Sequence, residues 1–270
     1  MNVFKKIVDF YINASLIVAL SVAAMVQITL FEFEQSHDVL LTGALFFGTI
    51  VAYNFIKFGT QAKKFYIVET RYVKMIQLLS FACAAFAAYC FLQLSWETII
   101  WSGALCMLNV IYALPISSNH RNIRNIHGIK VHIVAIVWSG ATVILPLVNA
   151  KITLNTDVLI EVIQRYLFVL AIMMPFEIRD LQFDAPSLGT IPQIFGVKKT
   201  KGLGVFCLLA MMLLEIFNQQ HEVKHFLIML FVALLSMGMI INASVKKNKY
   251  YCGFWVESIP ILWAVLLFLF

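Results

Sequence analysis

The stretch from Glu177 to Gly202 holds the residues with the clearest potential for chemistry. Three carboxylates, Glu177, Asp180 and Asp184, follow the end of an apolar run, and their i, i+3, i+7 spacing places them on one face of a helix. Carboxylate oxygens are the ligands that hard divalent cations such as Mg²⁺ take in proteins. The pattern therefore predicts a cation site at the mouth of an apolar helix.

Basic residues accompany this acidic face. Arg179 lies among the carboxylates, and a short segment then brings Lys198, Lys199 and Lys201. Lysine and arginine bind phosphate oxygens, and a divalent cation in such a site usually accompanies phosphates. The alternative interpretation is a solvated loop that merely ends a membrane helix, since charges gather at membrane edges.

The composition indicates where these charges lie. The chain has 270 residues, of which 61% are hydrophobic and 13% charged, and its mean hydropathy is +0.88. A soluble domain of this length could not bury so much apolar surface. We therefore expect an all-α, polytopic membrane protein with one transmembrane domain over residues 1–270. The net charge of +6 does not require nucleic acid, because basic loops beside a bilayer account for it.

Nine apolar stretches are each long enough to cross a bilayer as a helix. All but three of the 20 basic residues gather at one set of their ends, and the three are Lys151, Arg165 and Lys224. The positive-inside rule then places the N-terminus and the carboxylate stretch in the cytoplasm and the C-terminus on the opposite side. The predicted spans lie near residues 8–31, 38–56, 72–94, 97–115, 130–149, 158–176, 202–218, 225–244 and 253–270.

Four more polar residues lie near the predicted cytoplasmic ends of these spans. Asn54 and Lys57 end the second span, Tyr112 ends the fourth, and Lys130 opens the fifth. An amide and an ammonium group at such a position can bind diphosphate oxygens. Simpler roles also exist, because Lys57 can extend to the lipid headgroups and Tyr112 can anchor a helix at the interface.

These segments resemble the UbiA superfamily of intramembrane prenyltransferases. The second aspartate-rich motif of that family reads D-x-R-D-x-x-x-D, and the segment EIRDLQFD at 177–184 is similar to it. The run GTIPQIFGVKK at 189–199 is similar to the tail that follows the motif, and YALP at 112–115 is similar to the end of the fourth span. Nine spans with polar connections after the second and sixth extend the resemblance over the whole chain.

The resemblance implies a nine-helix bundle with a cavity that faces the cytoplasm. It also implies transfer of an isoprenyl group from an isoprenyl diphosphate to a lipophilic, often aromatic, acceptor in the bilayer. By the same resemblance Mg²⁺ is held by Glu177, Asp180 and Asp184, of which Asp180 and Asp184 are catalytic. The substrate-binding residues are then Asn54, Lys57, Tyr112, Lys130, Arg179, Lys198 and Lys199.

The first aspartate-rich motif of the family, N-D-x-x-D-x-x-x-D, is changed in this chain. Asn54 matches its asparagine, but the aspartate positions hold Phe55, Phe58 and Ala62, none of which can bind a metal. A divergent enzyme would then hold fewer magnesium ions, and Lys57, Lys63 or Lys64 could replace a lost cation by binding phosphate directly.

Two alternatives to an active enzyme stay open, and the first follows from this change. One is a non-catalytic membrane protein that binds isoprenoids or other lipids on the same fold. The other is a small secondary transporter, because charges inside membranes often mark an ion path. No feature of the sequence identifies a protein partner.

Overall fold

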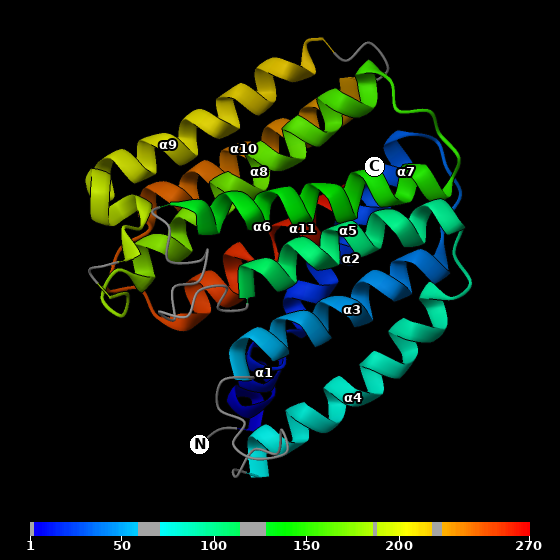
Figure 1. Cartoon of the computed structure of the whole chain (residues 1–270). Helices are drawn as coiled ribbons and strands as arrows, with labels where there is room; N and C mark the ends of the chain where they lie inside the picture. The colour runs from blue at the N-terminus through cyan, green and yellow to red at the C-terminus, as the bar shows by residue number, and fades with distance from the viewer. Residues whose placement is uncertain (1–2, 59–70, 114–127, 186–187, 218–222) are drawn as a thin grey trace.

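The regular secondary structure of the described chain is helical (Figure 1). The computed structural model describes residues 3–58, 71–113, 128–185, 188–217 and 223–270, without the side chains of residues 3, 4 and 111–113. Its helices are α1 (Val3–Asn13), α2 (Leu16–Glu32), α3 (Val39–Phe58), α4 (Arg71–Phe91), α5 (Trp96–Ala113), α6 (Ile129–Ser139), the π-helical turn η4 (Gly140–Ile144), α7 (Leu145–Asn149), α8 (Thr156–Asp180), α9 (Ile191–Glu215), α10 (Val223–Asn242), the π-helical turn η6 (Tyr251–Val256) and α11 (Ile259–Leu269).

Within the described residues, the first predicted span falls on the bent helix pair α1–α2, and each of the others falls on a helix or a continuous helical run. By length and composition, six helices of the described chain could cross a membrane, and the bent pair α1–α2 would make a seventh. The helices at the two remaining predicted spans are α5, which has 18 residues, and α9, which carries three lysines in its first half. The chain is thus a multi-pass membrane protein, whereas the count of nine and the orientation of the termini stay predictions.

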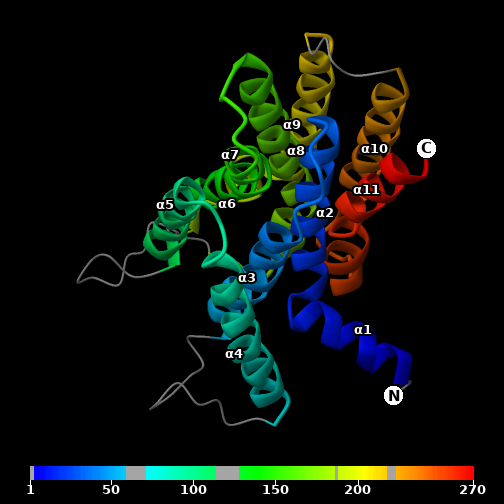
Figure 2. The same ribbon diagram turned by 90° about the vertical axis from the view of Figure 1, so that its right-hand side faces the viewer.

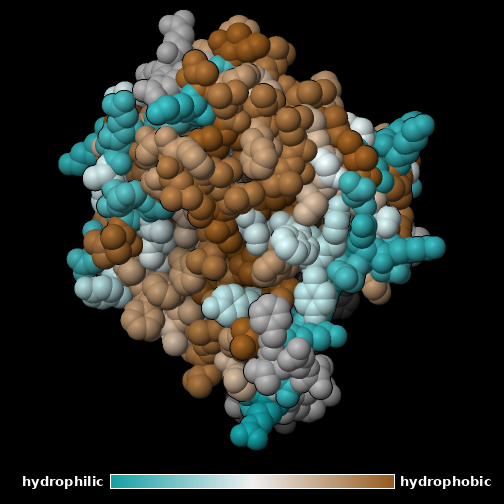
Figure 3. All heavy atoms as spheres, turned by 180° about the vertical axis from the view of Figure 1, so that it is seen from behind, coloured by the Kyte–Doolittle hydropathy of each residue, from teal (hydrophilic) through white to brown (hydrophobic). Residues whose placement is uncertain are grey.

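The helices pack side by side in a bundle (Figure 2). Helix α3 packs against α2 and α4, and α8 packs against α6 and α9. Helix α10 contacts α9 and α11, and α11 also packs against α2. The largest buried cluster draws side chains from α2, α3, α6 and α8–α11. The outside is also apolar: Figure 3 shows a broad hydrophobic surface with hydrophilic side chains gathered towards its two sides. This distribution suits a bundle that faces lipid around its middle.

Helix α8 carries the acidic stretch at its C-terminal end. The Asn155 side chain accepts a hydrogen bond from the Val158 N–H at 3.0 Å and so caps the first turn. Asp157 in the first turn and Arg179 in the last turn complement the helix dipole. With 25 residues the helix is about 37 Å long, more than the hydrocarbon core of a bilayer. The residues around Asp180 therefore reach the edge of the membrane.

Helices α1 and α2 meet at an angle of 63°, and side chains of α3 fasten this bend. Ser15, at the bend, has a positive φ of 60°. A helix end leaves carbonyl groups without partners. Lys57 Nζ donates to Ile12 O at 3.2 Å, and Asn54 Nδ2 donates to Ala14 O at 3.2 Å. Asn54 Oδ1 also accepts from Ser15 Oγ at 2.9 Å, so both α3 side chains close the corner between the first two helices.

We expect Asn54→Leu to lower the free energy of unfolding by about 1–3 kcal/mol or more, because buried polar groups lose their partners. Those partners include Ser80 Oγ, which Asn54 Nδ2 contacts at 2.9 Å. The measurement is unfolding in mixed micelles, with Asn242→Leu as the control. Asn242 is exposed, and its side chain donates to Gly238 O in the preceding turn of its own helix. Equal losses in the two variants would contradict a fastening role for Asn54.

Candidate functional site

Glu177 is buried near the end of α8 and forms an ion pair with Lys130 of α6. The Lys130 Nζ to Glu177 Oε1 distance is 2.8 Å, and the two side chains are 24% and 3% exposed. A carboxylate buried to this degree needs a positive partner to stay ionised. In this structure the first of the three predicted magnesium ligands is therefore neutralised by a lysine, which the sequence analysis assigned to the substrate.

Arg179 and Asp180 form a second, more exposed ion pair. Arg179 Nε lies 2.7 Å from Asp180 Oδ1, and the guanidinium also lies over the ring of Phe176 at 5.3 Å from its centroid. Partly exposed pairs contribute little stability, because water screens both charges. Both groups can consequently exchange partners at low cost, and a phosphate group could replace the carboxylate beside Arg179.

Asp184 follows one turn later and carries an unsatisfied oxygen. Its backbone N–H donates to Asp180 O at 2.9 Å, which keeps the two aspartates on one continuing turn. Its Oδ2 is buried and has no hydrogen-bond partner among the described residues. Buried carboxylate oxygens are normally paired, so an oxygen without a donor is a candidate ligand for a cation.

The three carboxylates do not converge in this structure. No group of three or more His, Cys, Asp or Glu side chains in the described chain lies close enough to hold a metal ion. Glu177 turns to Lys130, and Asp180 turns to Arg179. The residues therefore do not fit a three-carboxylate magnesium cage, whereas Asp180 and Asp184 together could supply two ligands to an ion that phosphate and water complete.

The end of α3 and the start of the last helical run approach the end of α8. Coulombic interactions link Glu257, directly after η6, to both Lys57 and Arg179. Lys57 itself is bound at the α1–α2 bend, where its ammonium group also donates to Ser15 Oγ at 2.9 Å. The acidic motif gave no sign that Glu257 belongs near this site. Glu257 lies in an apolar stretch at the other end of the chain.

Helix α1 contacts the segment between α10 and η6. Asp9 accepts hydrogen bonds from Lys249 Nζ at 2.6 Å and from the Tyr250 hydroxyl at 2.7 Å. The hydrogen bond to Asp9 raises the pKa of Lys249, which lies in the segment between α10 and η6. This contact joins the N-terminal helix to the segment that leads to Glu257.

The run after the acidic motif starts α9. Gln193 Oε1 accepts from the Thr190 N–H at 2.9 Å, and Gln193 Nε2 donates to Ala185 O at 3.1 Å, which ties the helix start to the preceding loop. Gly196 has a φ of +78° and breaks the helical path, a conformation that favours glycine. Lys198 and Lys199 follow this break and are exposed. Both ammonium groups are thus accessible to an anionic ligand.

The remaining predicted positions either carry no polar group or lie outside the described part of the chain. Phe55 is 55% exposed and Phe58 is partly buried, which leaves the first-motif positions of α3 without a polar group. The side chain of Tyr112 lies outside the described part of α5, and Ala62 lies outside the described residues. Their predicted roles stay predictions.

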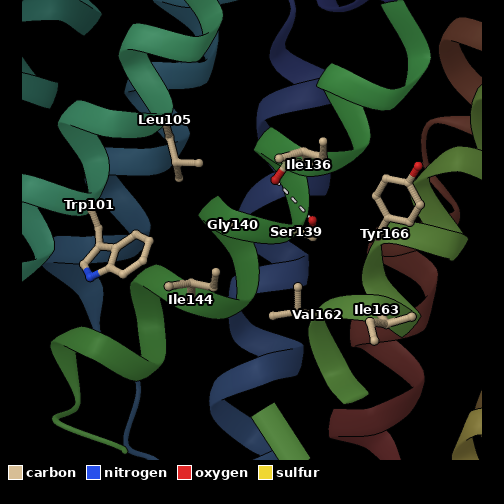
Figure 4. Close-up of a pocket in the computed structure, with 9 residues that line it drawn as sticks. All are labelled: Trp101, Leu105, Ile136, Ser139, Gly140, Ile144, Val162, Ile163 and Tyr166. Atoms are coloured by element: carbon tan, nitrogen blue, oxygen red, sulfur yellow. Dashed lines mark hydrogen bonds between the residues drawn. The ribbon is translucent and has the colours of Figure 1, made fainter. Parts of the chain in front are cut away.

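An apolar pocket of about 290 Å³ lies between α5, α6 with η4, and α8. Figure 4 shows α5 on one side, the π-helical turn in the middle and α8 on the other side. Gly140 lets the turn approach α5, because a Cβ there would come within 2.7 Å of Leu105 Cδ2. The lining residues are Trp101, Leu105, Ile136, Ser139, Gly140, Ile144, Val162, Ile163 and Tyr166.

The two hydroxyl groups in the pocket wall are already engaged in hydrogen bonds. Ser139 Oγ donates within its own helix to Ala135 O at 2.7 Å, and the Tyr166 hydroxyl forms a hydrogen bond of 2.5 Å with His132 Nδ1. Tyr166 lies eleven residues before Glu177, about 16 Å along α8. The pocket therefore offers hydrocarbon contacts, at a depth below the charged end of the same helix. No polar pattern in the sequence could have indicated it.

Comparison with known proteins gives a likeness in structure only. No protein-family model matches the chain, and no curated protein sequence matches it. The apo structure of a UbiA homolog from Aeropyrum pernix K1 superposes with a TM-score of 0.67 at 14% identity, over 93% of this chain and 97% of that chain. The chain has the UbiA fold. A structure of digeranylgeranylglyceryl phosphate synthase superposes with a TM-score of 0.56 at 12% identity, over 98% of this chain and 96% of that chain.

The UbiA fold confirms the architecture expected from the second motif. At identities of 14% and 12% the likeness establishes the fold and leaves the chemistry to the residues of this chain. Those residues place an acidic and basic cluster at the end of α8, with an apolar pocket farther along the same helix.

We expect Lys130→Met to lower the free energy of unfolding by about 2–4 kcal/mol, because it leaves Glu177 buried without its positive partner. Adding Glu177→Gln removes the unpaired charge and should recover a large part of the loss. Unfolding of both variants in mixed micelles measures this coupling, with Lys246→Met on an exposed loop position as the control. A double variant no more stable than Lys130→Met would contradict the assigned ion pair.

Proposed function

We propose that this protein is a divergent intramembrane prenyltransferase. Its substrates are an isoprenyl diphosphate and a lipophilic, aromatic acceptor taken from the bilayer. The observation that carries the proposal is the cluster of Arg179, Asp180 and Asp184 at the end of α8 in a UbiA fold. The basic residues favour an orientation in which this cluster and the N-terminus face the cytoplasm.

Cationic side chains of this site bind and orient the diphosphate. Arg179 exchanges Asp180 for a phosphate group, since a guanidinium binds carboxylate and phosphate in the same forked geometry. Lys198 and Lys199 are exposed and add positive charge from α9. Lys130 contributes from α6 while Glu177 holds its position. The charge on the leaving diphosphate is thus distributed over side chains of three helices.

Asp180 and Asp184 are the residues that would hold Mg²⁺, and Asp184 Oδ2 is the oxygen without a partner in the described chain. When bound, the ion supplies further neutralisation of the leaving diphosphate. In the proposed reaction the bond from the isoprenyl carbon to the diphosphate oxygen breaks, the acceptor supplies the electron pair of the new bond, and the proton that the acceptor loses passes to the departing diphosphate. Stabilisation of the departing negative charge is the main contribution of such a site.

The apolar pocket between α5, η4 and α8 suits the hydrocarbon part of a substrate. Ser139 and Tyr166 in its wall are already hydrogen-bonded, so a hydrocarbon chain leaves the polar contacts of these two residues intact. Its distance of about 16 Å from Glu177 along α8 separates it from the headgroup site. A long substrate would therefore be held at both ends of the same helix.

A non-catalytic isoprenoid-binding protein is the second candidate. It is favoured by the charge pairing, since Glu177 is neutralised by Lys130 and the α3 positions Phe55 and Phe58 carry no carboxylate. Such a protein would keep the hydrocarbon pocket and lose the transfer reaction.

Transfer of a labelled isoprenyl group by the purified protein distinguishes these candidates. We expect Asp180→Asn to lower the transfer rate by about 100–1000-fold, as loss of a group that stabilises transition-state charge does. Glu97→Gln, which alters an exposed carboxylate at the start of α5, is the matched control and should keep the wild-type rate. Full activity of Asp180→Asn would exclude the assigned site, and absence of transfer by wild type with lipid retained would favour the second candidate.

Filling the pocket tests the hydrocarbon site separately. We expect Val162→Phe to raise the KM for the isoprenyl diphosphate by about tenfold, because a change of one or a few methylene-sized groups in an apolar site has an effect of this size. Leu159→Phe is the control, since Leu159 lies on the same helix outside the pocket and is exposed. An unchanged KM in Val162→Phe would place the hydrocarbon chain elsewhere.

A further inference from the structure

A second group of charged side chains is buried in the other half of α8. Arg165 is fully buried, and its guanidinium lies 2.6 Å from Glu161 Oε1 on the preceding turn. It also donates to Met25 O at 2.9 Å and to Thr29 Oγ1 at 3.1 Å in α2. Its positive charge thus joins α8 to α2 in the apolar part of the bundle, where a bare charge would be very costly.

A second carboxylate approaches the same guanidinium. Glu32 Oε2 lies 3.8 Å from Arg165 Nη2, and the side chains of both Glu32 and Glu161 are 3% exposed. Two buried carboxylates therefore share one arginine. An ion pair offsets the cost of burying one negative charge, but a second negative charge at the same site stays uncompensated.

The two carboxyl groups meet at one arginine. Both are buried beside the same guanidinium nitrogen, Glu161 at 2.6 Å and Glu32 at 3.8 Å. One arginine balances one buried negative charge, so protonation of one of the two carboxyl groups removes the cost of the second charge. Glu32 Oε2 has no hydrogen-bond donor from the described chain, whereas Glu161 accepts from Arg165. Glu32 is thus the less closely paired carboxyl group, and the one on which a proton would reside.

Helices α9 and α10 bring further titratable groups towards Glu32. Glu215 of α9 accepts from Gln164 Nε2 at 2.8 Å, and its charge also acts on Glu32. On α10, His225 packs edge-on against Phe31, the residue before Glu32, with ring centroids 5.4 Å apart. A negative charge on Glu32 would therefore face two other carboxylates across the packed helices and Arg165 as the nearest cation.

We propose that Glu32 and Glu161 form a buried proton-binding site and hold one proton between them beside Arg165. A proton suits this site, because Arg165 already supplies a positive charge between the two carboxyl groups. It stands on the contacts of α2 with α8 and does not depend on prenyl transfer. Loss of the proton places an unpaired carboxylate against α8 and weakens the junction between the two helices.

The sign of the pH effect follows from proton binding. In the unfolded chain both carboxyl groups are ionised near neutral pH, whereas the native state retains one proton. Stability therefore falls as pH rises, because the native state binds the extra proton. The stabilisation is complete in mildly acidic solution and is lost as the shared proton dissociates.

Thermal unfolding of the full chain in lipid nanodiscs, between about pH 6 and pH 9, tests the proposal. We expect the melting temperature of the wild type to fall as pH rises. Glu32→Gln imitates the protonated acid, so it should match the wild type at pH 6 and lack this part of the decline. Glu161→Gln removes the nearest counter-ion of Arg165 and should lower the melting temperature at every pH.

Infrared spectroscopy of the wild type gives a second readout that does not depend on a variant's folding. We expect a carbonyl band of a buried protonated carboxyl group at pH 6 that disappears at alkaline pH, and Glu32→Gln should lack it. The proposal is overturned if the wild type shows no such band. It is also overturned if Glu32→Gln is as unstable as Glu161→Gln at pH 6, or fails to fold, since the glutamine keeps the shape of the neutral acid.

Discussion

The pairing of charges along α8 is the interaction on which the rest of the structure depends. In apolar surroundings a charge persists only beside a partner, because its desolvation costs several kcal/mol or more. Arg165 and Glu161 satisfy this requirement in one half of the helix, and Glu177 with Lys130 satisfies it in the other. The partners of Arg165 include α2, and the partner of Glu177 comes from α6. The pairs therefore determine where α8 sits against its neighbours and, through this, where its acidic end is placed.

The same constraint divides the acidic motif into groups with different roles. Glu177 is buried and paired with Lys130, so its direct role is to fix the position of this lysine. Asp180 is partly exposed beside Arg179, and Asp184 carries a buried oxygen without a partner in the described chain. A site of this kind combines a small number of oxygen ligands with several cations, which agrees with the loss of the first aspartate-rich motif. In the proposed reaction, neutralisation of the diphosphate would then depend more on side chains and less on metal ions.

Much of the fold was predictable from the sequence, because apolar stretches of about 20 residues define membrane helices whatever their tertiary contacts. The local spacing of the acidic motif likewise predicted its place at the end of α8. The role of Asn54 was not predictable, since the bend near Ser15 lies inside one apolar run and only the fold brings α3 to it. Lys130 and Glu177 are 47 residues apart, so their pairing is also a tertiary property. The pocket beside Gly140 leaves no signal, because its apolar lining resembles any membrane helix.

The central claim is that the end of α8 binds a divalent cation together with a diphosphate. Electron paramagnetic resonance of Mn²⁺, used in place of Mg²⁺ with a non-hydrolysable isoprenyl diphosphate analogue, tests it most directly. The account predicts that the analogue promotes Mn²⁺ binding to the purified protein and that the spectrum shows magnetic coupling between manganese and the phosphorus nuclei. Mn²⁺ binding that is independent of the analogue, or that shows no phosphorus coupling, would contradict it.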